Sequence, residues 1–136
     1  MLDNEIILLK YNKMTDNLKA IEKIVKNTYC IIGIPMLNTR KQPQAQIRGA
    51  ILTALSGRFK SPEIGEVLNR DRTMVNYYKN NHEFNMRFWK DYKVYYDIAE
   101  EQASRIYNEE IKDKEVEIID RKIELLLQER KELIQK

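Results

Sequence analysis

The stretch SPEIGEVLNRDRTMVNYYKNN, residues 61–81, decides the fold, because it holds two short helical patterns separated by a tight turn. Ser61 is a favourable N-cap, and Pro62 at the first helical position loses no hydrogen bond by lacking an N–H. Residues 69–71 form the turn, and Asp71 can cap the helix that follows it. Two short helices on such a turn, the second opening with polar side chains, are typical of a helix-turn-helix.

The apolar residues of these two patterns predict which faces are buried. Their helical spacing points one set toward the core: Ile64, Val67, Leu68, Val75 and Tyr78. We expect the second helix to span residues 72–82. Gly65 costs about 1 kcal/mol relative to alanine inside a helix, so we expect a close helix–helix approach at that position.

The remaining sequence also predicts helices, which makes the chain all-α. Apolar residues recur in steps of three and four over residues 3–28, over residues 44–58 and after Glu83. The stripe after Glu83 comprises Phe88, Tyr92, Tyr95, Ala99, Ala103 and Ile106. Residues 29–45 contain glycine and two prolines and predict a loop. A kink near Met14 stays open, since Thr15-Asp16 can also begin a second helix.

The C-terminal residues follow a heptad pattern, interrupted by Arg130. Its a and d positions are Val116, Ile119, Ile123, Leu126 and Leu133. A helix with so short a pattern is only marginally stable by itself in water. The tail therefore needs a partner, either another copy of the tail or the first helix folded against it. We therefore expect a helix-turn-helix domain over residues 1–83 and, over residues 84–136, a helical extension that makes a homo-oligomer.

Composition excludes several classes of protein. With 136 residues, 33% of them charged, and only 4 Gly and 3 Pro, the chain fits one helical domain with an extension. One cysteine, Cys30, and one histidine, His82, rule out an internal disulfide and argue against a zinc site. We expect Cys30 to be buried and His82 to be solvated near a helix end. Without a membrane-length apolar run or a signal pattern, we expect no membrane partner and a location in the bacterial cytoplasm or a phage-infected cell.

Charge is distributed unevenly along the chain. Residues 1–60 carry ten basic and four acidic side chains, whereas residues 94–136 carry eight basic and twelve acidic ones. A basic first half suits a polyanionic partner. No paired catalytic carboxylates, no Cys–His pair and no phosphate-binding glycine loop are present, so we expect neither an enzyme, a metal, a cofactor nor a small-molecule substrate.

Two motifs resemble those of a known DNA-binding domain. TRKQPQAQIRGAILTAL, residues 39–55, precedes a segment that joins Pro62-Glu63-Ile64-Gly65 to Arg70-Asp71, Thr73 and Val75. This combination resembles the C-terminal DNA-binding domain of the bacterial replication initiator DnaA, over roughly residues 16–82. The resemblance implies a helix-turn-helix bundle with double-stranded DNA as its partner. The DnaA ATPase has no counterpart in this sequence.

The resemblance also implies which residues contact DNA. Asp71 and Thr73 match positions that reach base edges in the major groove, and Arg48 matches the arginine that enters the adjacent minor groove. Arg40 and Lys41 match a basic loop that touches phosphate.

Two departures from the family pattern lie in the second helix. Arg72 replaces a histidine and has the geometry to bind guanine with two hydrogen bonds, while Met74 replaces a threonine. The DNA site is therefore expected to differ from that of DnaA. We expect further phosphate contacts from Lys60, Ser61, Tyr77 and Lys79.

Three interpretations of function follow from the sequence. The leading one is a sequence-selective DNA-binding regulator of transcription or replication, plausible for a phage or mobile element. The alternative is a DNA-packaging or assembly protein like the small terminase subunits of phages, which a ring-sized assembly in solution would distinguish. A third is a protein-interaction module that has lost DNA binding. It would lack the fall of DNA affinity with salt, a log–log slope of about 0.9 per phosphate contact.

Overall fold

The computed structural model describes residues 2–37, 39, 41–70 and 72–135, and every regular element in these ranges is a helix. The elements are α1 (Leu2–Ile32), α2 (Gln44–Ser56), α3 (Ser61–Leu68), α4 (Arg72–Asn80), α5 (His82–Phe88), α6 (Tyr92–Ile106), the π-helix η1 (Tyr107–Lys112) and α7 (Asp113–Gln135). The all-α prediction is confirmed.

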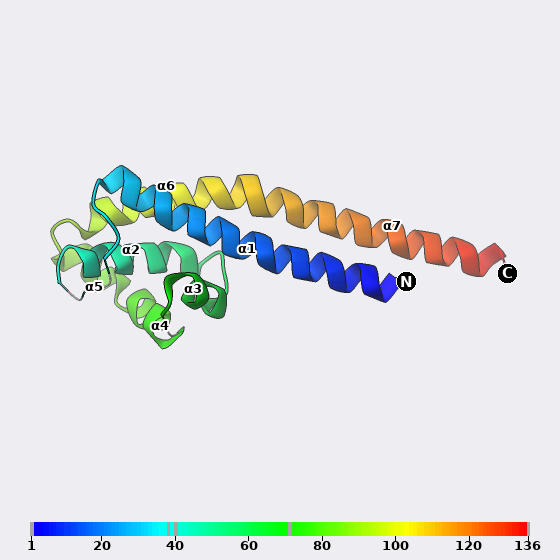
Figure 1. The fold of residues 1–136 in the computed structure, drawn as a ribbon, viewed down its shortest axis with the longest axis horizontal. Coiled ribbons are helices and arrows are strands. Elements are labelled where there is room, and N and C mark those ends of the chain that lie inside the picture. Colours follow the sequence, from blue (N-terminus) through cyan, green and yellow to red (C-terminus); the bar gives the residue numbers. More distant parts are fainter. Residues whose placement is uncertain (1, 38, 40, 71, 136) are drawn as a thin grey trace.

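The molecule has two parts, which we call the head and the arm (Figure 1). The head contains α2 to α6 and the C-terminal half of α1. The arm consists of residues 2–16 of α1 and all of α7, which run side by side in opposite directions and project from the head (Figure 1). The helices α6, η1 and α7 follow one another without a gap, so they connect head and arm.

The first helix is longer than predicted and is helical throughout. It continues to Ile32 rather than ending at residue 28, because Thr28 and Tyr29 are buried in the core. It ends at Gly33, whose φ of 83° lies in the left-handed region that glycine adopts without strain, and whose N–H donates to Tyr29 O at 2.9 Å. Thr15 and Asp16 therefore do not begin a second helix.

The hydrophobic core lies where α1, α2 and α6 meet, with α3 and α4 closing one side. Its largest fully buried side chains include Ile21, Ile24, Ile47, Ile51, Leu52, Leu55, Ile64, Tyr92 and Ile106. The same core continues to Ile111. The boundary expected after residue 83 therefore does not coincide with the end of the core, because Ala99 and Ala103 on α6 are as fully buried as the residues of α2.

The stripe predicted after Glu83 is interrupted. Phe88 ends α5 and is 63% exposed, whereas Tyr92 begins α6 and is completely buried. Trp89 between them has an extended backbone (φ −93°, ψ 116°), which changes the direction of the chain. The predicted stripe therefore does not form one buried face: Phe88 is exposed and Tyr95 is half-buried. Tyr92, Ala99, Ala103 and Ile106 are buried.

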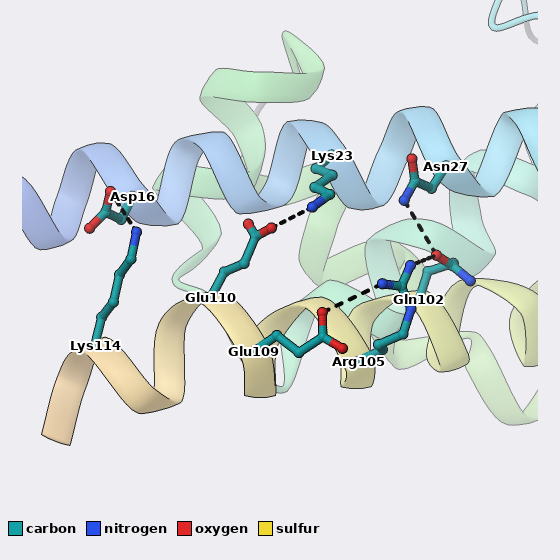
Figure 2. Close-up of polar contacts among 8 residues, drawn as sticks. All are labelled: Asp16, Lys23, Asn27, Gln102, Arg105, Glu109, Glu110 and Lys114. Carbon is teal, nitrogen blue, oxygen red and sulfur yellow. Dashed lines mark hydrogen bonds and ion pairs between the residues drawn. The ribbon is translucent and has the colours of Figure 1, made fainter.

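Polar pairs hold α1 against the helix that runs beside it (Figure 2). They are Asn27 with Gln102 (3.5 Å), Lys23 with Glu110, and Asp16 with Lys114 (3.4 Å). The residue numbers fall on α1 as they rise on the other helix, which defines an antiparallel arrangement. Hydrogen bonding from i to i+5 in η1 is consistent with both Ile106 and Ile111, five residues apart, being buried.

Candidate nucleic-acid interface

Of the tight turn predicted at residues 69–71, the structure describes Asn69 and Arg70. Asn69 has φ 53° and ψ 50°, a left-handed conformation that asparagine tolerates better than most residues. The N–H groups of Asn69 and Arg70 both donate to Gly65 O, which closes the end of α3. The chain then enters α4 at Arg72. This turn fixes the direction of α4 relative to α3.

The inner face of α4 is anchored on α2, as predicted for Val75 and Tyr78, which are both buried. The contact depends on Gly49, which the sequence did not single out. A Cβ at Gly49 would lie 2.7 Å from Cδ1 of Tyr78, closer than carbon atoms approach. Gly49 therefore permits the close approach of α2 and α4. Gly65 is buried in α3, and the close approach expected there remains a prediction.

Among the described side chains of α4, those on the outer face are all polar or aromatic. Its exposed residues are Thr73, Asn76, Tyr77, Lys79 and Asn80, and we call this set the α4 face. Thr73, Tyr77 and Lys79 were predicted from the sequence. Asn76 and Asn80 were not, although their spacing of three and seven residues from Thr73 puts them on the same side of a helix.

The start of α3 is held by Glu63. Its carboxylate accepts the Lys60 N–H at 3.2 Å and the Asn17 side-chain amide at 2.9 Å, which ties α3 to α1. Lys60 rather than Ser61 is therefore the N-cap, because the capping group comes from Glu63. Lys60 also lines a groove with Glu115 and other residues of α7. It lies at the opposite end of α3 from the turn, so the structure does not bring Lys60 and Ser61 to the turn-side end of the candidate site.

Arg48 does not point freely outward, as minor-groove insertion would require. It is 7% exposed, and its Nη2 donates to the carbonyl oxygens of Leu37 (3.2 Å) and Thr39 (2.8 Å). Gln44, one turn earlier on α2, donates to Pro35 O at 2.7 Å and accepts the Leu37 N–H at 3.2 Å. In this structure Arg48 is a tether of the loop before α2, and its burial argues against the expected base contact. Gln44, which was not predicted from the sequence, also binds backbone groups of this loop, one turn earlier on α2.

The remaining predicted contacts divide into exposed and undescribed residues. Lys41 is exposed in the loop before α2. Arg40 and Asp71 lie outside the described residues, as does the side chain of Arg72, whose backbone begins α4. Their expected DNA contacts remain predictions from the sequence.

A cavity of about 260 Å³ lies behind the turn. Arg48, Asn69 and Arg70 line it together with Tyr29, so the structure brings the tethered loop and the turn next to each other. Burial raises the pKa of the Tyr29 hydroxyl, an effect that the nearby Arg48 and Arg70 guanidinium groups oppose. Tyr29 therefore stays neutral at physiological pH.

His82 is less solvated than the sequence suggested. It begins α5 directly behind α4, and its Nδ1 lies 2.9 Å from the Tyr92 hydroxyl, which in turn lies 3.4 Å from Thr53 Oγ1. Burial lowers the pKa of His82, while Glu83 and Glu100 partly offset that effect. The ring packs at an angle against Tyr96 as well. Cys30, expected to be buried, is exposed near the end of α1.

The described residues form neither a metal-binding cluster nor a membrane-spanning helix. Within the described ranges, no three side chains of His, Cys, Asp or Glu gather into a cluster able to hold a metal ion. None of the described helices combines the length and the apolar character needed to cross a membrane.

Comparison with protein-family models, with curated proteins and with solved structures gave no match. The resemblance to the DnaA domain therefore remains an expectation from the motifs in residues 39–80. What the chain does has to be argued from its own geometry.

Proposed function

We propose that this protein binds double-stranded DNA sequence-selectively by inserting α4 into the major groove. The observation that carries the proposal is the α4 face: a helix anchored by Val75 and Tyr78 presents a continuous row of hydrogen-bonding side chains outward. The major groove admits an α-helix, and its base edges offer a distinct pattern of donors and acceptors for each base pair.

The chemistry of the α4 face suits base recognition. The Asn76 amide can donate and accept at once, which matches the N6 and N7 edge of adenine. Thr73 supplies a hydroxyl and a methyl group in the first turn, where recognition helices contact bases. From the sequence, Asp71 and Arg72 are expected to add contacts at the same end of the helix.

Phosphate contacts would set the position of the helix in the groove. Residues 72–80 contain two basic and no acidic side chains, so nothing on α4 repels the DNA backbone. Lys79 on α4 and Lys41 on the preceding loop are both exposed and can reach phosphate oxygens. These charges support the proposed role, a regulator of transcription or replication that uses a helix-turn-helix without an ATPase.

A DNA-packaging role like that of small terminase subunits is the second candidate. It is favoured by one observation: the heptad row of α7 is exposed, as an oligomerisation helix would be. The two candidates share the DNA-binding head and differ in the size of the assembly.

The DNA-binding proposal is tested by selecting bound sequences from a random DNA pool and then measuring affinities of variants. Asn76→Ala is expected to weaken binding to the selected site by about 1–3 kcal/mol and to relax the preference at one base position. Lys79→Ala is expected to weaken all sequences alike and to lower the salt slope by about one unit. Lys112→Ala, an exposed lysine of η1, is the matched control and should change nothing.

The result that would contradict the proposal is equally definite. A protein that enriches no sequence, and whose binding to duplex DNA does not fall with salt, is not a DNA-binding regulator. That result would favour the protein-interaction module instead.

A further inference from the structure

The row of apolar side chains on α7 has no cover in the single chain. Val116, Ile119, Ile123, Leu126 and Leu133 are between 49% and 66% exposed. No described residue of α7 is fully buried. An amphipathic helix is stabilised mainly by burying its apolar face, so this row calls for another surface.

Folding α1 against α7 does not supply that surface. The half-buried residues among the described positions of α7 are Glu115, Ile118, Lys122 and Leu125, which follow the buried Ile111 on a neighbouring row. Each of them directly precedes a residue of the exposed row, and successive residues point about 100° apart on an α-helix. The two alternatives left open by the sequence are therefore compatible: α1 covers one row, and the heptad row remains open to a second copy.

The helix α7 also continues past α1 (Figure 1). Arg121 pairs with Glu5 at 3.4 Å, and the described part of α1 begins at Leu2. In an antiparallel pair, about four more residues of α7 have a neighbour on α1, which leaves roughly ten residues, or ~15 Å, without one. This end carries four large apolar side chains: Leu126, Leu127, Leu133 and Ile134, all more than half exposed.

We propose that two copies of the chain pair through their α7 helices in antiparallel orientation. In one register the exposed row matches itself: Val116 lies opposite Leu133 of the second copy, and Ile123 opposite Leu126 of the second copy. Arg130 then lies opposite Ile119. A parallel pair would instead place Arg130 against Arg130, and two like charges at a packed position repel.

The charges along α7 also favour the antiparallel orientation. Residues 113–120 carry four acidic side chains and one basic one, a net charge of −3, whereas residues 121–135 carry four basic and three acidic ones, a net charge of +1. Antiparallel pairing places the acidic end of each helix opposite the basic end of the other. It also places the positive N-terminal end of each helix dipole beside the negative C-terminal end of the other.

The contact area reaches the lower end of the range for specific interfaces. With 1.5 Å per residue, α7 is about 34 Å long and residues 2–16 of α1 are about 22 Å long, so with helices about 10 Å wide one arm offers about 560 Å². Two arms together would bury about 1,100 Å², and a specific interface buries at least about 1,000 Å² in total. The projecting end of each α7 would also lie near the second copy's α1, where Ile7 and Leu8 are exposed.

Molar mass in solution tests the pairing directly, in the absence of DNA. Light scattering on the full chain at tens of micromolar is expected to give twice 16.3 kDa. Ile123→Glu/Leu126→Glu is expected to give one chain mass and still fold, because both side chains are exposed in the single chain. Gln128→Glu/Gln135→Glu adds the same charge away from the row and should remain a dimer.

Disulfide trapping tests the orientation. In a Cys30→Ser background, proteins carrying Val116→Cys and Leu133→Cys are expected to form a mixed disulfide when combined and oxidised. Leu133→Cys alone should not cross-link to itself. A single-chain mass for the unaltered protein, a ring-sized mass, dissociation of the control variant, or self-linking at Leu133→Cys would each overturn the proposal. Since no DNA is present, these results are independent of the DNA-binding proposal.

Discussion

Two helices of this molecule, α2 and α7, both carry apolar residues at helical spacing, but they differ completely in burial. Nine of the 13 residues of α2 are buried, while α7 has no buried residue among its described positions. The difference lies in the neighbours. Helix α2 packs against α1, α4 and α6, whereas the described residues of α7 contact η1 and α1 and border the open groove at the start of α3. One chain can therefore complete the head but not the arm.

This contrast has a consequence for DNA binding if both proposals hold. Antiparallel pairing of the arms would put the two heads at opposite ends of an overlap about 33 Å long. One turn of B-DNA, the spacing of half-sites for many dimeric helix-turn-helix proteins, is about 34–36 Å. We therefore expect the two heads to bind half-sites whose centres are at least one turn of DNA apart, rather than adjacent half-sites.

The largest effect is expected from truncating the same residue type in head and arm. Leu55 on α2 is completely buried, and Leu55→Ala should lower the free energy of unfolding by about 2–5 kcal/mol. Leu126 on α7 is 55% exposed, and Leu126→Ala should change it by no more than about 0.5 kcal/mol at concentrations where the chain is single. Urea titration, monitored by circular dichroism, measures the change in the free energy of unfolding for both variants.

The protein concentration separates folding from pairing in this experiment. At high concentration, Leu126→Ala is expected to weaken association, while the effect of Leu55→Ala persists at every concentration. Equal losses for both variants at low concentration would mean that the arm belongs to the same closed core as the head.

A smaller effect is expected where α4 is seated on α2. Gly49→Ala forces the Tyr78 ring to move, because the new Cβ would lie 2.7 Å from it, and should cost about 1–3 kcal/mol. Gly57→Ala is the matched control: no atom lies within 4 Å of its added Cβ, and its φ of −83° suits alanine, so it should stabilise the fold by about 0.4–1 kcal/mol. Thermal unfolding of both variants gives the comparison, and no loss at Gly49 would show that α4 is loosely held.

The fold was predictable where sequence pattern and local chemistry agree. The helices around residues 44–56 and 61–68, and the buried positions Val75 and Tyr78, follow from helical spacing and turn residues. The break at Trp89 was not predictable, because Phe88 and Tyr92 fit one stripe as well as two. Which row of α7 faces α1 also depends on contacts between distant residues, which no local pattern contains.

The sequence predicted which side chains of α4 are exposed, while their DNA contacts remain predictions. Thr73, Tyr77 and Lys79 follow from the position of the helix. The burial of Arg48 was not predicted, because its partners are backbone carbonyls of a loop, and backbone groups leave no signal in the sequence. Gly49 was missed for a similar reason, since its role depends on the Tyr78 ring of another helix.

The smallest effect is expected from pH, and it should distinguish head from arm once more. Burial lowers the pKa of His82 in the folded head below its ordinary value of 6.5, so the unfolded chain takes up the proton first as the pH falls. Stability is therefore full above about pH 6.5 and declines as the pH falls from there toward the lower pKa of the folded state.

The unaltered protein should melt at a lower temperature at pH 5.5 than at pH 7.5, and His82→Gln should show a smaller difference. The one histidine of the sequence lies in the head, so the molar mass should not change over the same range. If His82→Gln melts with the same pH dependence as the unaltered protein, the neutral ring packed between Tyr92 and Tyr96 does not contribute to the stability of the head.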